Sequence, residues 1–118
     1  MKIIKVAEET ISTLQDLIDY WRAKGLSVFI HETGDKWELS EIVVPKLERN
    51  QGLGSEFMNN LISLADKLNK TIILTPDTSF GASSVNRLKR FYKMFGFVEN
   101  KGRNKDFTFQ SSMYRYPQ

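Results

Sequence analysis

The sequence predicts an α/β protein whose central sheet is mixed, mostly antiparallel, and flanked by helices. Short strand-like runs alternate with longer runs in which apolar residues recur every three or four positions, the repeat of one helical face. Two pairs of strands are joined by short polar turns, and such hairpins make a sheet mixed rather than all parallel. The expected order of elements is β-α-β-β-α-β-α-β-β. A length of 118 residues suits one domain spanning residues 1–118.

The chain is expected to begin with a short strand and an amphipathic helix. Residues 3–6 form the strand, and Thr10 or Ser12 is the candidate N-cap of the helix. Gly25 ends this helix, as a glycine just beyond a helix C-terminus commonly does. The apolar face of the helix consists of Ile11, Leu14, Leu17, Ile18 and Trp21.

A hairpin is expected next. Residues 26–32 form its first strand, and the sequence Thr-Gly-Asp-Lys at residues 33–36 forms its turn. Residues 37–44 form the second strand, which Pro45 closes.

A second amphipathic helix follows, and after it a buried strand. The helix begins at residues 52–54, and Asn69 or Lys70 ends it. Its apolar face consists of Leu53, Phe57, Leu61, Leu64, Ala65 and Leu68. The strand at residues 71–75 is apolar on both sides and stops at Pro76, which is typical of a central strand.

The last third of the chain is expected to form a third helix and a second hairpin. Ser83 or Ser84 caps the helix, and Gly96 ends it. Residues 97–98 and 106–116 form the last two strands, joined by a polar turn. The apolar face of the third helix consists of Val85, Leu88, Phe91, Tyr92 and Phe95.

The composition excludes several kinds of chemistry. The chain has no cysteine, so disulfides, thiolate catalysis and cysteine-based zinc sites are excluded, and a single histidine, His31, cannot form a histidine cluster. No close-spaced carboxylate motif indicates a metal. The N-terminus does not look like a signal peptide, and no apolar run approaches the roughly 20 residues of a membrane helix. We therefore expect a cytoplasmic protein without a membrane partner.

The most informative stretch is the glycine loop, Arg49-Asn50-Gln51-Gly52-Leu53-Gly54, between an Ile-Val-Val-Pro strand end and the start of a helix. The first turn of a helix has amides without intrahelical partners and a partial positive charge, so a phosphate can bind there. Glycines let the ligand come close because they have no Cβ. The loop lacks the Gly-Lys-Ser/Thr of a Walker P-loop and the full Gly-x-Gly-x-x-Gly of a dinucleotide fingerprint.

In this context Arg-x-x-Gly-x-Gly resembles the acetyl-CoA motif of the GNAT superfamily of N-acetyltransferases. A second stretch looks like the superfamily's other signature: Phe91-Tyr92 on the third helix, followed by Gly96-Phe97. The two stretches come in the expected order, and the resemblance covers residues 39–98. It implies a GNAT-like (acyl-CoA N-acyltransferase) fold and an acetyl-CoA-dependent N-acetyltransferase. In such an enzyme a primary amine attacks the thioester directly, through a tetrahedral intermediate.

The resemblance also implies where acetyl-CoA would bind. Amides of the glycine loop would hold the pyrophosphate, and the backbone of residues 42–44 would pair with the pantetheine arm. This strand and the strand at residues 71–75 would part to make room for the cofactor. An N–H near Val43 or Val44 could stabilise the oxyanion. The cofactor-binding residues so implied are Ile42, Val43, Val44, Arg49, Asn50, Gln51, Gly52, Leu53, Gly54, Ser55, Ser84, Asn86 and Tyr92.

The catalytic candidates are one tyrosine and two glutamates. Tyr92 matches the tyrosine that often protonates the departing thiolate in this superfamily. Glu38 and Glu41 lie on the strand where members often place a carboxylate that accepts the proton of the amine, and His31 on the neighbouring strand is a third candidate base. Being three apart in a strand, the glutamates point to opposite faces, so only one can face the cleft; a bulge would change this alternation. The identity of the base stays open.

One position departs from the family pattern. Many members have an asparagine seven residues before the tyrosine, where this chain has Val85. Ser84 or Asn86 on either side could make the polar contact to the cofactor arm instead. The polar segment at residues 102–107 could line the acceptor pocket or reach the adenosine phosphate.

Two other functions stay open. A binding module could keep the fold and acyl-CoA but lack catalysis, which would fit the single evident helix before the first hairpin. A net charge of +3, a pI of about 9.2 and a basic third helix leave a small nucleic-acid-binding domain as the weakest alternative. As partner we expect a small-molecule or peptide amine acceptor, and a homodimer stays open.

Overall fold

The structure, a computed structural model, describes residues 11–45, 52–77 and 84–118, and the structural statements below refer to these residues. The strand expected at residues 3–6 lies outside them, as do the loop residues Arg49, Asn50 and Gln51.

Five strands form one mixed sheet in the order β1-β2-β3-β5-β4. β2 and β3 are parallel, whereas the pairs β1–β2, β3–β5 and β4–β5 are antiparallel. The prediction of a mixed, mostly antiparallel sheet is therefore confirmed. The strands are β1 (Ser27–Thr33), β2 (Lys36–Val43), β3 (Thr71–Leu74), β4 (Val98–Glu99) and β5 (Met113–Arg115).

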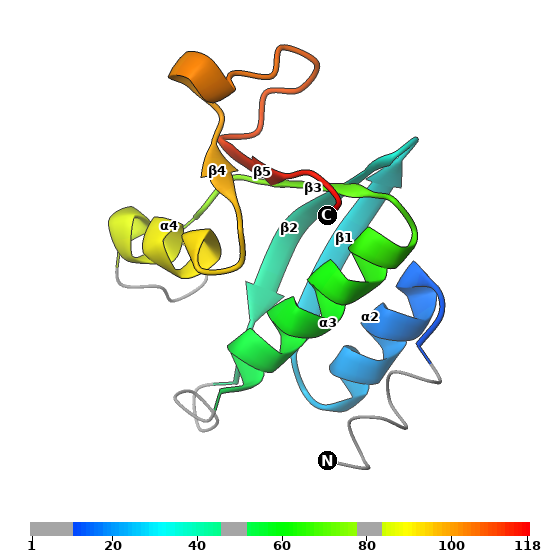
Figure 1. Ribbon diagram of the computed structural model, residues 1–118. Coiled ribbons are helices and arrows are strands. Elements are labelled where there is room, and N and C mark those ends of the chain that lie inside the picture. The colour runs from blue at the N-terminus through cyan, green and yellow to red at the C-terminus, as the bar shows by residue number, and fades with distance from the viewer. Residues whose placement is uncertain (1–10, 46–51, 78–83) are drawn as a thin grey trace.

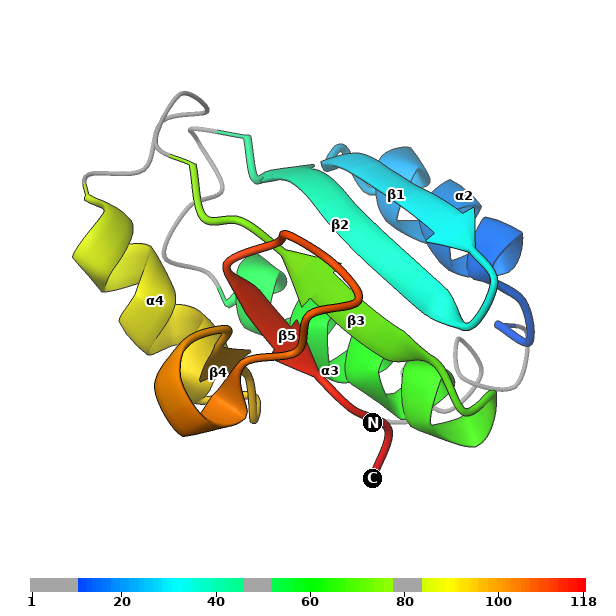
Figure 2. The same ribbon diagram turned by 90° about the horizontal axis from the view of Figure 1, so that it is seen from above.

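The helices and the long connection before β5 take different sides of this sheet. Helices α2 (Leu14–Ala23) and α3 (Leu53–Lys67) lie side by side on one face (Figure 1). Helix α4 (Val85–Lys93) lies where β2 and β3 end (Figure 2). The segment between β4 and β5, which includes the short 3-10 helix η3 (Gly102–Asn104), crosses the opposite face near β3 and β5 (Figure 2).

The core lies between the sheet and the pair α2 and α3. Trp21 and Trp37 are almost completely buried, and Phe57 contacts the Trp21 ring edge-on with a centroid separation of 5.9 Å. The indole N–H of Trp21 donates to Asn60 Oδ1 at 3.1 Å, and that of Trp37 donates to Glu32 Oε2 at 3.1 Å. Both tryptophans therefore bury a large apolar area without leaving a polar donor unsatisfied.

Helix α2 begins at a capping box. The Thr13 hydroxyl oxygen accepts from the Asp16 N–H at 3.1 Å, and the Asp16 carboxylate accepts from the Thr13 N–H at 3.2 Å. The prediction of Thr10 or Ser12 as N-cap is therefore wrong, because Ser12 donates to Asp16 instead. Gly25 follows the helix with a φ of +99°, as predicted for its C-terminus.

The last strand is much shorter than the sequence predicts. Only Met113–Arg115 pair with the sheet, instead of residues 106–116. The buried Asn100 explains the difference: its amide donates to the Ser111 carbonyl at 3.0 Å and accepts from the Asp106 N–H at 2.6 Å. These side-chain bonds compete with strand pairing for the backbone groups. The prediction of a long last strand is therefore wrong.

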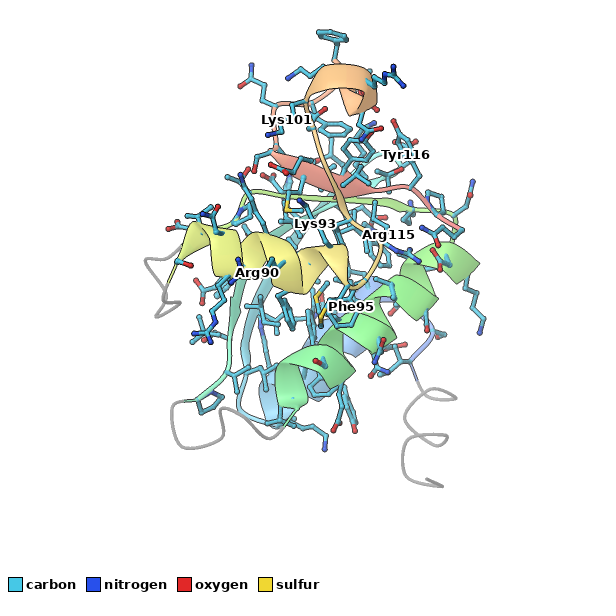
Figure 3. All side chains as sticks on the ribbon, turned by 60° about the vertical axis from the view of Figure 1, so that its left-hand side comes forward. Arg90, Lys93, Phe95, Lys101, Arg115 and Tyr116 are labelled. Carbon is cyan, nitrogen blue, oxygen red and sulfur yellow. The ribbon has the colours of Figure 1, made fainter. Side chains whose placement is uncertain are left out.

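Arg115 connects three elements around the end of the core. Figure 3 shows it between β5 and α3, and its guanidinium donates to the Asp66 carboxylate at 2.6 and 3.2 Å. Its Nε donates to the Phe95 carbonyl, just beyond α4, at 2.8 Å. The Gln118 N–H also donates to Asp66, at 3.0 Å. A buried arginine thus ties the end of α4 to α3 and the sheet.

Candidate active site

Strands β2 and β3 pair over only part of their length. Their pairing runs from Lys36 opposite Thr71 to Leu39 opposite Leu74, where β3 ends. β2 continues to Val43 and stays paired with β1 on its other side. The predicted parting of these two strands is confirmed, and one edge of β2 beyond Leu39 has no neighbouring strand in the described part of the chain.

A small cleft lies where the two strands part. Its volume is about 430 Å³, including the open mouth. The lining comes from β2, from the chain after β3 and from α4: Leu39, Ser40, Glu41, Ile42, Leu74, Thr75, Asp77, Leu88 and Tyr92. The cleft thus brings together an unpaired strand edge, two carboxylates and a phenol.

A β-bulge shapes the cleft wall on β2. Phe29 of β1 lies opposite Glu41 and the next residue, Ile30, lies opposite Leu39, so Ser40 is the extra residue. The Ser40 hydroxyl donates to the Phe29 carbonyl at 3.1 Å. The bulge occurs at the point where β2 leaves β3, which places it at the cleft.

The bulge also decides which way the glutamates point. Residues directly opposite each other in a sheet share a face. Leu39 and Ile42 both pair with core-side residues of β1, so Glu41 points to the other face together with Glu38, whose partner is His31. The prediction that Glu38 and Glu41 point to opposite faces is therefore wrong, and the bulge is the reason.

Tyr92 forms the wall of the cleft opposite β2. Its side chain is only 7% exposed, and its ring contacts those of Phe91 and Phe97 with centroid separations of 5.4 and 5.8 Å. Burial raises the pKa of the Tyr92 phenol to about 12. No group in the described ranges hydrogen bonds to its hydroxyl. A protonated phenol is therefore held at the cleft and free to donate to a bound molecule.

The start of α3 lies next to these elements. Gly52 is the N-cap, with a φ of +80°, and it has no side chain to cap the first-turn amides. A Cβ at Gly52 would meet no atom of the residues that the structure describes within 4 Å. A Cβ at Gly54 would lie 3.7 Å from the Phe91 ring and 3.9 Å from Val44 Cγ2. The uncapped helix end therefore opens outward at Gly52 and adjoins β2 and α4 at Gly54.

Comparison with solved structures identifies this arrangement. Ard1 from Thermoplasma volcanium is similar over 89% of this chain and 78% of its own, with 21% sequence identity and a TM-score of 0.54. GCN5 from Tetrahymena is similar over 100% of this chain and 88% of its own, with 16% identity and a TM-score of 0.49. Both are GNAT proteins. The chain has the GNAT fold. No protein-family model and no curated protein sequence matches the chain.

The GNAT fold brings some of the predicted site residues together. Glu41, Ile42 and Tyr92 line the cleft, and Gly52 and Gly54 begin the adjoining helix. These five come from three separate elements, β2, α3 and α4. Their roles stay predictions.

Other predicted residues lie elsewhere. Glu38 is exposed on β2 and does not line the cleft. Ser84 uses its hydroxyl oxygen to cap α4, accepting from the Arg87 N–H at 3.1 Å. Asn86 is exposed on the helical face that it shares with Lys93, seven residues on, away from the cleft side of α4. Arg49, Asn50 and Gln51 fall outside the described residues.

Sequence reasoning did not find several cleft residues of this GNAT fold. Thr75 and Asp77 follow β3, and their position after a strand that stops at a proline is the signal that could have indicated them. Leu88 lies one turn before Tyr92 on α4, so helical spacing alone places it beside the tyrosine. Ser40 had no comparable signal, because a bulge depends on the partner strand.

The described residues contain neither a candidate metal site nor a candidate membrane-spanning helix. No group of three or more His, Asp or Glu side chains there could hold a metal ion. No helix in those ranges combines the length and the apolar character needed to cross a bilayer.

Proposed function

We propose that residues 1–118 form a single N-acetyltransferase domain that transfers an acetyl group from acetyl-CoA to a primary amine. The observation that carries this proposal is the cleft between the parted strands, which has Glu41 on one side and the protonated Tyr92 on the other. Acetyl-CoA, when bound, supplies a thioester that an amine can attack.

The start of α3 is the proposed site for the pyrophosphate. Its first-turn amides lack a side-chain cap, and the space at Gly52 is open, so a diphosphate can approach the backbone. A Cβ at Gly54 would touch Val44 and the Phe91 ring, so this helix end lies beside β2 and α4. A ligand bound at the amides therefore has a short path along β2 to Tyr92.

The remaining parts of the cleft have distinct proposed tasks. The free edge of β2 beyond Leu39 offers backbone groups to an extended ligand, in the manner of an added strand. Glu41 accepts the proton that the amine loses, directly or through water, because it is the candidate base that lines the cleft. Tyr92 donates its proton to the departing thiolate.

The basic residues of α4 give little support to a nucleic-acid-binding function. Lys89, Lys93 and Lys101 all pair with Glu99, at 3.1, 3.0 and 3.5 Å. Hydrogen bonds from Lys93 and Lys89 lower the pKa of Glu99 to about 2, so this carboxylate stays charged. Part of the positive charge of α4 is therefore compensated within the fold.

The proposed cofactor site can be tested by binding. Calorimetry and thermal unfolding with acetyl-CoA would be compared for the wild type, Gly52→Glu and Gly52→Ala. Both substitutions impose the same positive φ on an L residue, at a cost of about 1 kcal/mol, but only glutamate adds a negative charge beside the diphosphate.

We expect the wild type and Gly52→Ala to bind and Gly52→Glu to lose binding. At 100 times its dissociation constant the ligand should stabilise the folded protein by about 2.7 kcal/mol. Equal affinity in Gly52→Glu and Gly52→Ala would contradict the pyrophosphate site. Release of free thiol in the presence of amines then separates an enzyme from a module that only binds the cofactor.

A further inference from the structure

Glu38 and Glu41 differ from most other carboxylates of the described chain, because no hydrogen bond or ion pair engages them. Asp66 binds Arg115, Glu32 binds Lys70 at 2.9 Å, and Glu99 binds three lysines. Glu56, on the exposed side of α3, also makes no such contact. Glu38 and Glu41 are therefore two unpaired negative charges on one sheet face, and one of them lines the cleft.

The bulge at Ser40 arranges these two charges in a row that leads out of the cleft. Glu41 comes first and Glu38 next, on the face opposite the helices. Two residues of strand span about 7 Å, so the carboxylates lie roughly that far apart or slightly more with the bulge.

No lysine or arginine in the described part of the chain forms an ion pair with Glu38 or Glu41, and Lys36 and Arg22 are engaged elsewhere. Lys36 is held by Asp35 at 3.2 Å and lies 5.9 Å from the Phe109 ring centroid. Arg22 donates to the Val28 carbonyl and stacks on Phe29 at 4.8 Å, on the outer strand. His31 lies directly opposite Glu38. The row therefore keeps a negative local charge on a protein whose net charge is +3.

A second observation, independent of the two glutamates, indicates that a ligand binds at the cleft end of the row. The Tyr92 side chain is more than nine-tenths buried, lines the same cleft as Glu41, and has no hydrogen-bond partner in the residues that the structure describes. A polar group held in this way is available to a molecule that enters between β2 and α4.

We propose that the acceptor is a short aliphatic diamine, with its reacting nitrogen between Glu41 and Tyr92 and its second ammonium group on Glu38. This proposal rests on the proposed acetyltransferase function. The reacting ammonium loses one proton toward Glu41, its nitrogen forms a bond to the acetyl carbon, the carbon–sulfur bond breaks, and the sulfur takes a proton from Tyr92. The acylated nitrogen then loses its second proton to the Tyr92 phenolate, directly or through water, which restores the phenol. The second ammonium keeps its proton and its charge, so Glu38 is a specificity-determining residue.

The test compares 1,4-diaminobutane with butylamine, which has the same carbon chain but no second charge. Steady-state kinetics would be measured for the wild type, Glu38→Gln and the control Asp19→Asn, which removes an exposed carboxylate of α2 that has no ion pair within the described residues. We expect a lower KM for the diamine than for butylamine in the wild type and in Asp19→Asn. In Glu38→Gln we expect the KM of the diamine to rise about three- to fivefold, which corresponds to the free energy of an exposed ion pair. The kcat and the KM of butylamine should stay unchanged. High salt should reproduce this rise in the wild type.

Two results would overturn the inference and are distinguishable. Acetyl transfer to both amines with equal KM, or equal effects of Glu38→Gln and Asp19→Asn, would remove the diamine proposal and leave the acetyltransferase. Absence of transfer to either amine, with acetyl-CoA binding intact, would also remove the diamine proposal. Absence of thiol release with a wider set of amines and peptides would remove the enzyme itself.

Discussion

The chemistry proposed here depends most on a single hydroxyl group, that of Tyr92. Burial among Phe91 and Phe97 raises the pKa of this phenol to about 12, and a tyrosine is protonated below its pKa. The group therefore stays a proton donor throughout the range in which an amine can be tested. General-acid catalysis of this kind typically accelerates a reaction by 10²–10⁴-fold.

We accordingly expect Tyr92→Phe to lower kcat by about 100-fold while acetyl-CoA affinity stays the same. In the wild type, loss of the general acid should not reduce the rate until the pH exceeds about 10, since ionisation is centred near 12. Thiol-release kinetics from pH 6 to 10.5 with calorimetry on both proteins would check this. Wild-type turnover in Tyr92→Phe at every pH would exclude the phenol as the proton donor.

At the residue scale, some of this site could be predicted from the sequence and some could not. Tyr92 and the glycines at 52 and 54 belong to local patterns, which a sequence displays directly. The direction of Glu41 depends on the bulge at Ser40, which is stabilised by a bond between the Ser40 side chain and the backbone of β1. Side-chain alternation in one strand contains no information on such a cross-strand contact.

At the scale of elements, the position of α4 depends on Arg115. Partial burial disfavours the charge of Asp66, but hydrogen bonds from Arg115 and from the Gln118 N–H outweigh this and lower the Asp66 pKa. The same guanidinium holds the Phe95 carbonyl at the end of α4, so one side chain fixes the helix that carries Tyr92. A substitution of Arg115 should therefore affect both the stability of the fold and the activity of the proposed enzyme.

We expect Arg115→Ala to lower the free energy of unfolding by about 3 kcal/mol, because it leaves Asp66 and the Phe95 carbonyl without their buried partner. The control is Lys101→Ala, which removes an exposed ion pair with Glu99 and should change stability by about 0.5 kcal/mol or less. Urea unfolding monitored by tryptophan fluorescence would measure both. Similar effects of the two substitutions would show that Arg115 is not a structural clamp.

The elements themselves were predictable where one local pattern decides them. Most residues of the predicted apolar faces of α2, α3 and α4 are buried or half-buried, but Leu68 and Val85 are exposed and Ile11 precedes α2. β3 is as fully buried as its composition predicts. The last strand was not predictable, because its length depends on the Asn100 amide. This amide donates to backbone carbonyls nine and eleven residues away in the sequence. The N-cap of α2 had several candidates, because hydroxyl side chains are close together before this helix. Among them, Thr13 alone has an acidic residue three positions later, with which it forms the capping box.

At the scale of the whole molecule, the site is a consequence of topology. Among the strands that the structure describes, only β2 and β3 are parallel neighbours, and they part because β3 ends while β2 continues along β1. α3 connects these two strands and α4 follows the second, so the start of α3 lies beside β2 and α4 while Tyr92 lines the gap. The alternation of elements in the sequence predicted this order, whereas the depth and lining of the cleft required packed side chains.

The same buried phenol should make the stability of the whole fold sensitive to alkali. The ordinary tyrosine pKa is 10.0 and the folded value for Tyr92 is about 12, so between these pH values the folded state holds a proton that the unfolded state has lost. Ionisation thus favours unfolding: the stability contributed by Tyr92 is complete below pH 10 and is lost as the pH rises through 12. A difference of two pKa units corresponds to about 2–3 kcal/mol.

Tyr92→Phe has no phenol to ionise, and because the hydroxyl has no hydrogen-bond partner among the described residues, the variant should match the wild type at pH 7. Urea unfolding from pH 7 to 11.5 should therefore show the wild type losing stability relative to Tyr92→Phe above pH 10, and parallel curves would show that the phenol is not buried in the folded protein.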